Sequence, residues 1–237
     1  MTRRIRHPTT SALAPVHPVR RAAGEALALL LPVRCAGCDT DGIALCDGCR
    51  AALTPRVVRR PVAGFAVHAG LAFTEQRARV VRALKEEGRT GLARPLAGAL
   101  RAAALTGVAE ASGTASVGEW TVVCVPTSRA AMRRRGFRVV ELLARRAGLP
   151  ATRLLTPARA TGDQRGLDRA ARVRNVAGSM RARDAAGRAI LLLDDVVTTG
   201  ATLAEARRTL LDAGAAIVAV AALAATPRRD ETHTSPR

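Results

Sequence analysis

Short apolar runs alternate with amphipathic segments along the second half of the chain. Runs at 120–125, 189–193 and 216–223 predict buried strands, and apolar residues at helical spacing predict helices over 138–147 and 203–213. This alternation is typical of an α/β fold, in which helices cover both faces of a parallel sheet.

The first half of the chain is less regular. Apolar residues at 65–73 predict strands, whereas 76–87 and 92–105 have helical spacing. The stretch 50–62 is rich in Arg and Pro and predicts a connector, and 106–118 is rich in small residues and predicts a flexible connection.

Four of the five cysteines form two Cys-x-x-Cys pairs separated by seven residues: Cys35 with Cys38, and Cys46 with Cys49. This spacing lets four thiolates surround one Zn²⁺ in a closed, structural site. Disulfides are the alternative, which a cytosolic compartment disfavours. Cys124 lies within an apolar run, so we expect an inert core residue there and not a nucleophile.

The richest chemistry lies at 190–202, which reads Ile-Leu-Leu-Leu-Asp-Asp-Val-Val-Thr-Thr-Gly-Ala-Thr. In an open parallel sheet, ligands bind where a strand ends and a helix begins. The small residues at 198–202 can place N–H groups and hydroxyls around a phosphate, and the helix N-terminus adds positive charge. Asp194 and Asp195 would repel that phosphate, but they can bind sugar hydroxyls or Mg²⁺. A plain strand–turn–helix with a capping Asp is the alternative.

The charge and composition of the chain limit the classes of binding partner that we expect. The 237 residues carry a formal net charge of +19, which favours polyanions with salt-sensitive affinity, although general solubility explains it equally well. Aromatic residues make up 2% of the chain, which argues against stacking of bases on aromatic platforms. Lys85 is the only lysine, so its compact ammonium group is a candidate for a specific role.

The stretch 190–202 resembles the phosphoribosyl-pyrophosphate (PRPP) signature of type I phosphoribosyltransferases at all thirteen positions. The resemblance implies that Asp194 and Asp195 face the ribose hydroxyls of Mg²⁺-bound PRPP. It also implies that 198–202 wraps the 5′-phosphate. The residues expected to bind PRPP are Asp194, Asp195, Val196, Thr198, Thr199, Gly200, Ala201 and Thr202.

Several further pieces, in order, resemble the ComF family of phosphoribosyltransferase-like proteins over about 22–225. These pieces are Leu-Pro-x-x-Cys-x-x-Cys at 31–38, Leu84-Lys85-x-x-Gly88, Val125-Pro126, Arg-Arg-Gly-Phe at 134–137, Glu141, Arg159-x-Thr161-x-x-Gln164-x-Gly166-Leu167 and Arg172-x-x-Asn175-Val176. One departure is that Arg138-Val139 stand where the family usually has Asn-Gln, so any contact of that amide pair is missing or is replaced by a cation.

The resemblance implies a type I phosphoribosyltransferase-like parallel sheet flanked by helices, with a small N-terminal, four-cysteine, zinc-ribbon-like module. The expected parts are a flexible basic arm (1–20), a zinc module with a leading helix (21–62), a connecting part of the core (63–118), the phosphoribosyltransferase-like domain (119–226) and a disordered tail (227–237). Asp194, Asp195 and Lys85 are the candidate catalytic residues. We expect the long polar stretch 150–188 to form a hood or lid beside the ligand. Candidate pyrophosphate or lid contacts are Arg129, Arg135, Gln164, Arg172 and Asn175.

Three functions remain open. The first is an enzyme that transfers phosphoribosyl from PRPP to an unknown acceptor. The second, implied by a link of the ComF family to DNA uptake, is the handling of single-stranded DNA, with helicase-type proteins of DNA uptake as further partners. The third is a PRPP sensor without turnover. We expect a cytoplasmic location and no membrane span, because the apolar run at 22–31 is short and contains Glu25.

Overall fold

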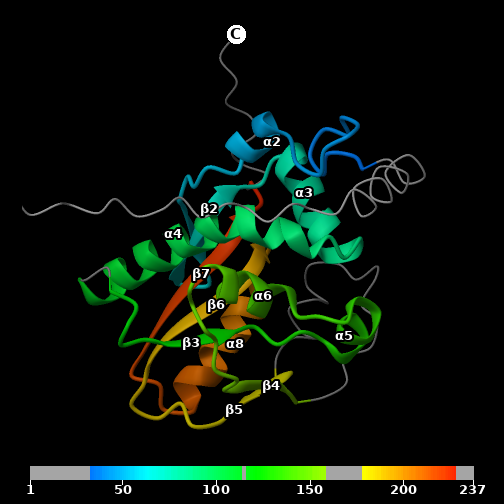
Figure 1. The fold of residues 1–237 in the computed structure, drawn as a ribbon. Coiled ribbons are helices and arrows are strands. Elements are labelled where there is room, and N and C mark those ends of the chain that lie inside the picture. Colours follow the sequence, from blue (N-terminus) through cyan, green and yellow to red (C-terminus); the bar gives the residue numbers. More distant parts are fainter. Residues whose placement is uncertain (1–32, 114–115, 159–177, 228–237) are drawn as a thin grey trace, which may run out of the picture.

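A five-stranded sheet lies at the centre of the computed structural model, which describes residues 33–113, 116–158 and 178–227 (Figure 1). Its strands are β1 (Val58–Val62), β2 (Phe65–Ala72), β3 (Thr121–Cys124), β6 (Ala189–Val197) and β7 (Ile217–Ala225). They lie in the order β1-β2-β7-β6-β3; β1 runs antiparallel to β2, and the other neighbours are parallel. The predicted α/β fold is therefore confirmed, with one antiparallel strand added at an edge.

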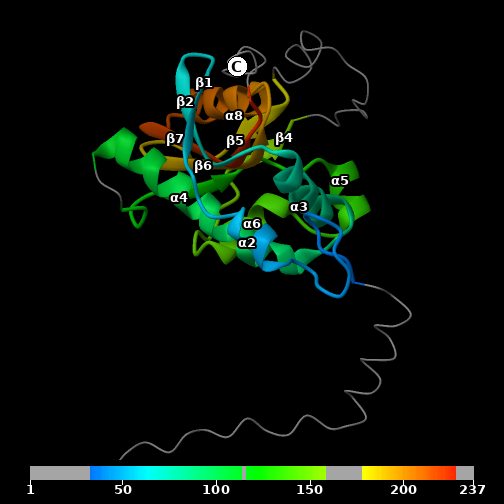
Figure 2. The same ribbon diagram turned by 90° about the horizontal axis from the view of Figure 1, so that it is seen from above.

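Helices cover both faces of this sheet. They are α2 (Asp47–Ala51), α3 (Glu75–Glu86), α4 (Ala93–Ser112), α5 (Arg129–Arg135), α6 (Val139–Arg146) and α8 (Ala201–Asp212). Figure 2 shows α8 on one side of the sheet and α3, α4 and α6 on the other. A small antiparallel ribbon of β4 (Leu155–Pro157) and β5 (Met180–Ala182) lies beside α8. Within the described ranges, no helix is long and apolar enough to cross a membrane.

The apolar run of β6 supplies both halves of the core. Because side chains alternate along a strand, Leu191 and Leu193 pack in the cluster of α4 and α6, whereas Ile190 and Leu192 pack in that of α8. All four side chains are fully buried. Each contributes about 1.5–3 kcal/mol by leaving water, so this strand fixes the position of whatever follows it.

A glycine allows the closest approach between the sheet and α4. A Cβ atom on Gly70 of β2 would lie 2.0 Å from the carbonyl oxygen of Ala99 in α4. Any other residue here would force the helix away from the sheet. The pair thus sets how closely α4 covers β2.

Three predictions about elements are corrected. The stretch 50–62, expected to be a connector, contains the edge strand β1. The stretch 106–118 is helical as far as Ser112, because α4 buries Gly107 and Val108 against the core despite their small side chains. The motif strand, expected to end at Leu193, continues through both acids to Val197, because its pairing with β7 extends that far.

Some expectations lie wholly or partly outside the described residues. They are the arm at 1–20, most of the leading helix at 21–33, the tail at 227–237, and the lid candidates Gln164, Arg172 and Asn175. The stretch 150–188 contains the β4–β5 ribbon at its two described ends.

Candidate functional site

The paired acids lie near the carboxyl end of β6, the strand between β7 and β3. Asp194 pairs in register with Ala222 of β7, and its Oδ1 accepts a 2.8 Å hydrogen bond from the backbone N–H of Asp195. The Oδ1 of Asp195 accepts a 2.7 Å bond from the N–H of Val196. These short local bonds fix both carboxylates by their Oδ1 atoms and leave Oδ2 of each for a partner from another element or for a ligand.

Lys85 reaches this acid pair from a different element. It lies near the end of α3, and its Nζ is 2.9 Å from Oδ2 of Asp195; the two side chains are 24% and 16% exposed. The only lysine of the chain is thus half-buried beside the predicted ribose-binding acids. A compact ammonium group leaves room beside it for a charged ligand.

The acid pair is electrostatically strained without a ligand. Burial and the neighbouring Asp195 carboxylate raise the pKa of Asp194 to about 7, against opposing effects of the Asp195 N–H and Lys85. Two carboxylates with a single nearby ammonium group leave an excess of negative charge. A bound cation or a set of hydroxyl donors would relieve it.

The loop after β6 has the form required of a phosphate cradle. Gly200 has a φ of 79° and stands immediately before α8, which begins at Ala201. The N–H of Ala201 donates to Oγ1 of Thr199 at 3.3 Å, while Thr198 is exposed and Thr202 lies in the first turn of the helix. The free N–H groups of this first turn and the helix dipole both favour an anion here.

Edge strand β1 braces that loop. This contact was not predicted from the sequence. The guanidinium of Arg60 donates to the backbone carbonyl of Thr198 at 3.0 Å and also to that of Thr226, just after β7. Val62 packs so tightly under Gly200 that a Cβ there would lie 2.4 Å from its Cγ1. The signal was weak because two adjacent arginines and Pro61 hide the alternation of β1 in the sequence.

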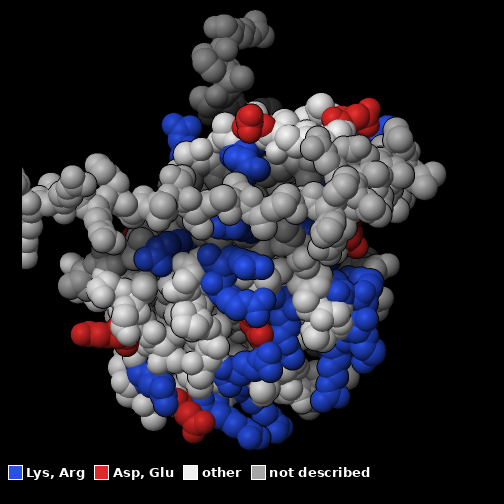
Figure 3. Space-filling view, viewed as in Figure 1, with Lys and Arg blue, Asp and Glu red and all other residues white. Residues whose placement is uncertain are grey.

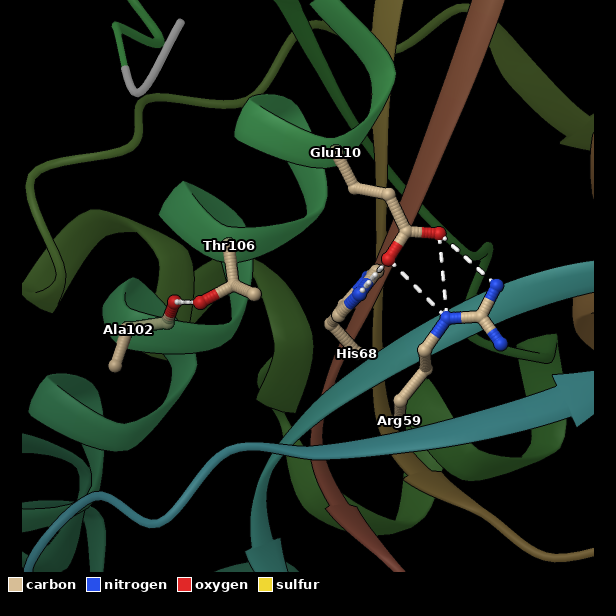
Figure 4. Close-up of polar contacts among 5 residues, drawn as sticks. All are labelled: Arg59, His68, Ala102, Thr106 and Glu110. Atoms are coloured by element: carbon tan, nitrogen blue, oxygen red, sulfur yellow. Dashed lines mark hydrogen bonds and ion pairs between the residues drawn. The ribbon is translucent and has the colours of Figure 1, made fainter. Parts of the chain in front are cut away.

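A cluster of polar side chains holds β1 and β2 against α4, as Figure 4 shows. Glu110 of α4 accepts hydrogen bonds from Arg59 of β1, at 3.1 Å from both Nε and Nη2, and lies 2.9 Å from Nε2 of His68 on β2. His68 is only 4% exposed. Since Arg59 neighbours Arg60, this anchor also fixes the strand that braces the loop after β6.

The four predicted metal ligands come together at the other end of α3. The sulfur atoms of Cys35, Cys38, Cys46 and Cys49 all lie within 4.8 Å of one another. In a tetrahedral zinc site with Zn–S bonds of about 2.3 Å, the sulfurs are about 3.8 Å apart, so the cluster fits such an ion. Burial raises the pKa of Cys35, but hydrogen bonds from backbone N–H groups, that of Cys46 foremost, outweigh this effect and lower the pKa to about 6. The lowered pKa favours a thiolate ligand.

Helix α3 connects the cysteine cluster with the acid pair. Near its start, Gln76 donates from Nε2 to the sulfur of Cys49 at 3.0 Å, and near its end Lys85 meets Asp195. Just beyond the helix, Arg89 donates to two backbone carbonyls of the cysteine module, at 2.8 and 2.7 Å. The module therefore fixes the helix that carries Lys85.

Other predicted contacts lie on the arginine-rich part of the surface. Arg129 and Arg135 are at the two ends of α5; Arg129 is exposed, and the buried Nε of Arg135 has no hydrogen-bond partner among the described residues. Within the described ranges, neither Arg129 nor Arg135 contacts the acid pair. Figure 3 shows basic side chains gathered over this part of the molecule.

Cys124 and the departure at 138–139 lie beside the site. Burial, aided by Glu141 and Asp194, raises the pKa of Cys124 to about 12, so its thiol stays protonated at neutral pH. Arg138 precedes the first turn of α6, and Val139 is buried in the core.

Comparison with known proteins identifies a family for this chain. A family model described as the phosphoribosyl transferase domain matches residues 109–235, more than half of the chain. A solved structure titled "Structure of the allosteric regulatory enzyme of purine biosynthesis" is 22% identical over 55% of this chain, with a TM-score of 0.32. The matched part spans 25% of that protein's length, and no curated protein matches. From the family match, the chain belongs to the phosphoribosyl transferase domain family.

Proposed function

We propose that this protein binds PRPP with Mg²⁺ at 194–202 and transfers its phosphoribosyl group to a nitrogen acceptor. The observation that carries the proposal is the placing of two carboxylates, one ammonium group and a helix N-terminus at the end of a single buried strand. Few ligands other than a phosphorylated sugar require all of these groups in one place. Within the family, we place the chain with the ComF group, on the motifs quoted above.

Each part has a role in this proposal. The N–H groups and hydroxyls of 198–202 hold the 5′-phosphate, and Asp194 and Asp195 accept hydrogen bonds from the ribose hydroxyls. Lys85 holds Asp195 in place and, beside the departing pyrophosphate, adds positive charge. Mg²⁺, held by the acids and the substrate, would supply further charge neutralisation.

The reaction itself is a displacement at the anomeric carbon. The acceptor nitrogen forms a bond to that carbon as the bond to the pyrophosphate oxygen breaks, and the bonding electrons leave with pyrophosphate. Positive charge that develops on the ribose ring is stabilised by the nearby carboxylates. The acceptor loses its proton to solvent or to the leaving group.

The cysteine cluster completes the proposal as a structural zinc site. Four thiolates leave no open position for catalysis, and Gln76 orients one of them from α3. Zinc binding would therefore stabilise the module that fixes Lys85.

The test is isothermal titration of PRPP and Mg²⁺ into the zinc-loaded protein, followed by an assay for pyrophosphate release with candidate acceptors. Binding with release supports an enzyme. Binding without release, across acceptors, supports a PRPP sensor. No binding to the folded protein contradicts the proposal.

A second candidate function rests on the basic surface. Helix α5 carries Arg129, Arg133, Arg134 and Arg135, within the basic region of Figure 3, and the chain has a net charge of +19. Single-stranded DNA would bind such a surface with an affinity that falls steeply with salt. Fluorescence anisotropy of a labelled oligonucleotide at low and at high salt tests it, and binding that ignores salt, or no binding, excludes it.

A further inference from the structure

A pocket of about 260 Å³ opens at the carboxyl end of β3, the strand that pairs with β6. Its walls come from the end of β3, the first turns of α6, and the segment that leads into β4. Cys124, which lines it, pairs in register with Leu193, the residue before Asp194. The pocket and the PRPP acids therefore share one edge of the sheet, where the ends of parallel strands form ligand sites.

The size and walls of the pocket restrict its occupant. Its volume is below the roughly 300–1,000 Å³ of pockets that hold drug-sized ligands, so it suits a single ring and not a nucleotide. Pro126, Leu155 and Pro157 supply apolar walls. A flat ring can lie between such surfaces without leaving polar groups unsatisfied.

The polar side of the pocket carries an excess of positive charge. The carboxylate of Glu141 accepts hydrogen bonds from the guanidinium of Arg153, at 3.1 Å from Nε and 2.9 Å from Nη2. These two bonds engage both the carboxylate and the guanidinium. The Nε of Arg138 is 3.6 Å from Glu141, an ion pair longer than a hydrogen bond. Two guanidinium groups thus face one carboxylate, and the side chain of Arg138 is only 31% exposed.

We propose that this pocket holds the acceptor of the transfer, and that the acceptor is a small ring compound with a carboxylate bound by Arg138. The inference rests on the proposed function and adds the substrate class. A guanidinium fork matches the two oxygens of a carboxylate. The nucleophilic nitrogen, in the ring or attached to it, then points along the sheet edge toward Asp194 and the anomeric carbon. Glu141 is a positioning residue that orients Arg138.

The experiment compares ring acids with their neutral counterparts: nicotinate with nicotinamide, anthranilate with anthranilamide, and orotate with uracil. Each is titrated calorimetrically into the zinc-loaded full chain, with and without PRPP and Mg²⁺. At least one acid should bind tenfold or more tightly than its neutral counterpart. Equal binding within every pair, or no acid binding at all, overturns the inference.

Variants of Arg138 test whether the preference for ring acids depends on this side chain. Arg138→Gln should abolish the preference for the acid, and Arg138→Lys should keep part of it, because the charge remains while the fork is lost. Arg145→Gln is the matched control, since it removes the same charge from an exposed position of the same helix. A preference that survives in Arg138→Gln, with the fold intact by Trp120 fluorescence, overturns the assignment.

The two proposals fail separately. If PRPP does not bind the wild type, the proposed function fails whatever the ring acids do. If PRPP binds and is lost in Asp194→Asn, yet no acid preference appears, only the acceptor class fails.

Discussion

Replacing Asp194 by asparagine should stabilise the ligand-free protein at neutral pH while removing its affinity for PRPP. The asparagine keeps an oxygen for the N–H of Asp195, now bonded at 2.8 Å. What it removes is a half-buried carboxylate that lies beside a second carboxylate. The chain thus retains a group that weakens the fold, as expected of a residue kept for binding.

The magnitude follows from the pKa of Asp194, which is raised from 3.8 to about 7. Between these values the unfolded chain has lost a proton that the folded protein still holds, so stability falls as pH rises through this window. About three pH units at 1.36 kcal/mol each give a ceiling of about 4 kcal/mol. Since the variant also loses an attraction to Lys85, we expect a gain of about 1–3 kcal/mol above pH 7.

The assay is urea unfolding of the zinc-loaded protein from pH 5 to 8, followed by fluorescence of Trp120, the single tryptophan, which is 9% exposed. The difference between variant and wild type should grow with pH and level off above 7. Asp41→Asn, which removes an exposed carboxylate (72% exposed), is the control and should change stability by less than about 0.5 kcal/mol. A variant no more stable than wild type at pH 8, or a difference independent of pH, refutes the reasoning.

Three further predictions concern the parts around the acid pair. Lys85→Met should destabilise the free protein by about 1–3 kcal/mol by urea unfolding, because Asp195 loses its partner, and Lys85→Arg should restore most of it; equal stability of all three contradicts this. Gly200→Ala should cost about 1–3 kcal/mol and weaken PRPP binding in calorimetry, because its φ is 79° and a Cβ would meet Val62. Adding Val62→Ala should recover part of this, and no recovery contradicts the packing argument. Removing zinc with a chelator should weaken PRPP binding about fivefold or more through α3, and restored zinc should reverse it; unchanged affinity contradicts that link.

The sequence predicted the parts of this fold that depend on short-range patterns. The apolar run of β6 could be recognised because four large residues precede two acids. The cysteine cluster could be recognised because two Cys-x-x-Cys pairs seven residues apart are typical of a metal site. The strand at 58–62 could not, since two arginines and a proline hide its alternation. It exists because β2 offers it a partner, which is tertiary information.

Some residues of the candidate site could likewise be predicted from the sequence, and others could not. The acids and the loop at 198–202 lie within one continuous stretch, so their proximity follows from the sequence. Lys85 attracted interest only by its rarity, and its contact with Asp195 depends on where the fold places α3. Arg60 had no distinguishing signal among the many arginines, because only the pairing of β1 brings it to the loop.

The measurement that tests the account most directly is calorimetric titration of PRPP with Mg²⁺ into zinc-loaded wild type and into the double variant Asp194→Asn/Asp195→Asn. We expect saturable binding to the wild type and its loss in the double variant, with both proteins folded. Absence of binding to the folded wild type, or equal binding to both, would contradict the assignment of the β6 acids and the following loop as a phosphoribosyl site.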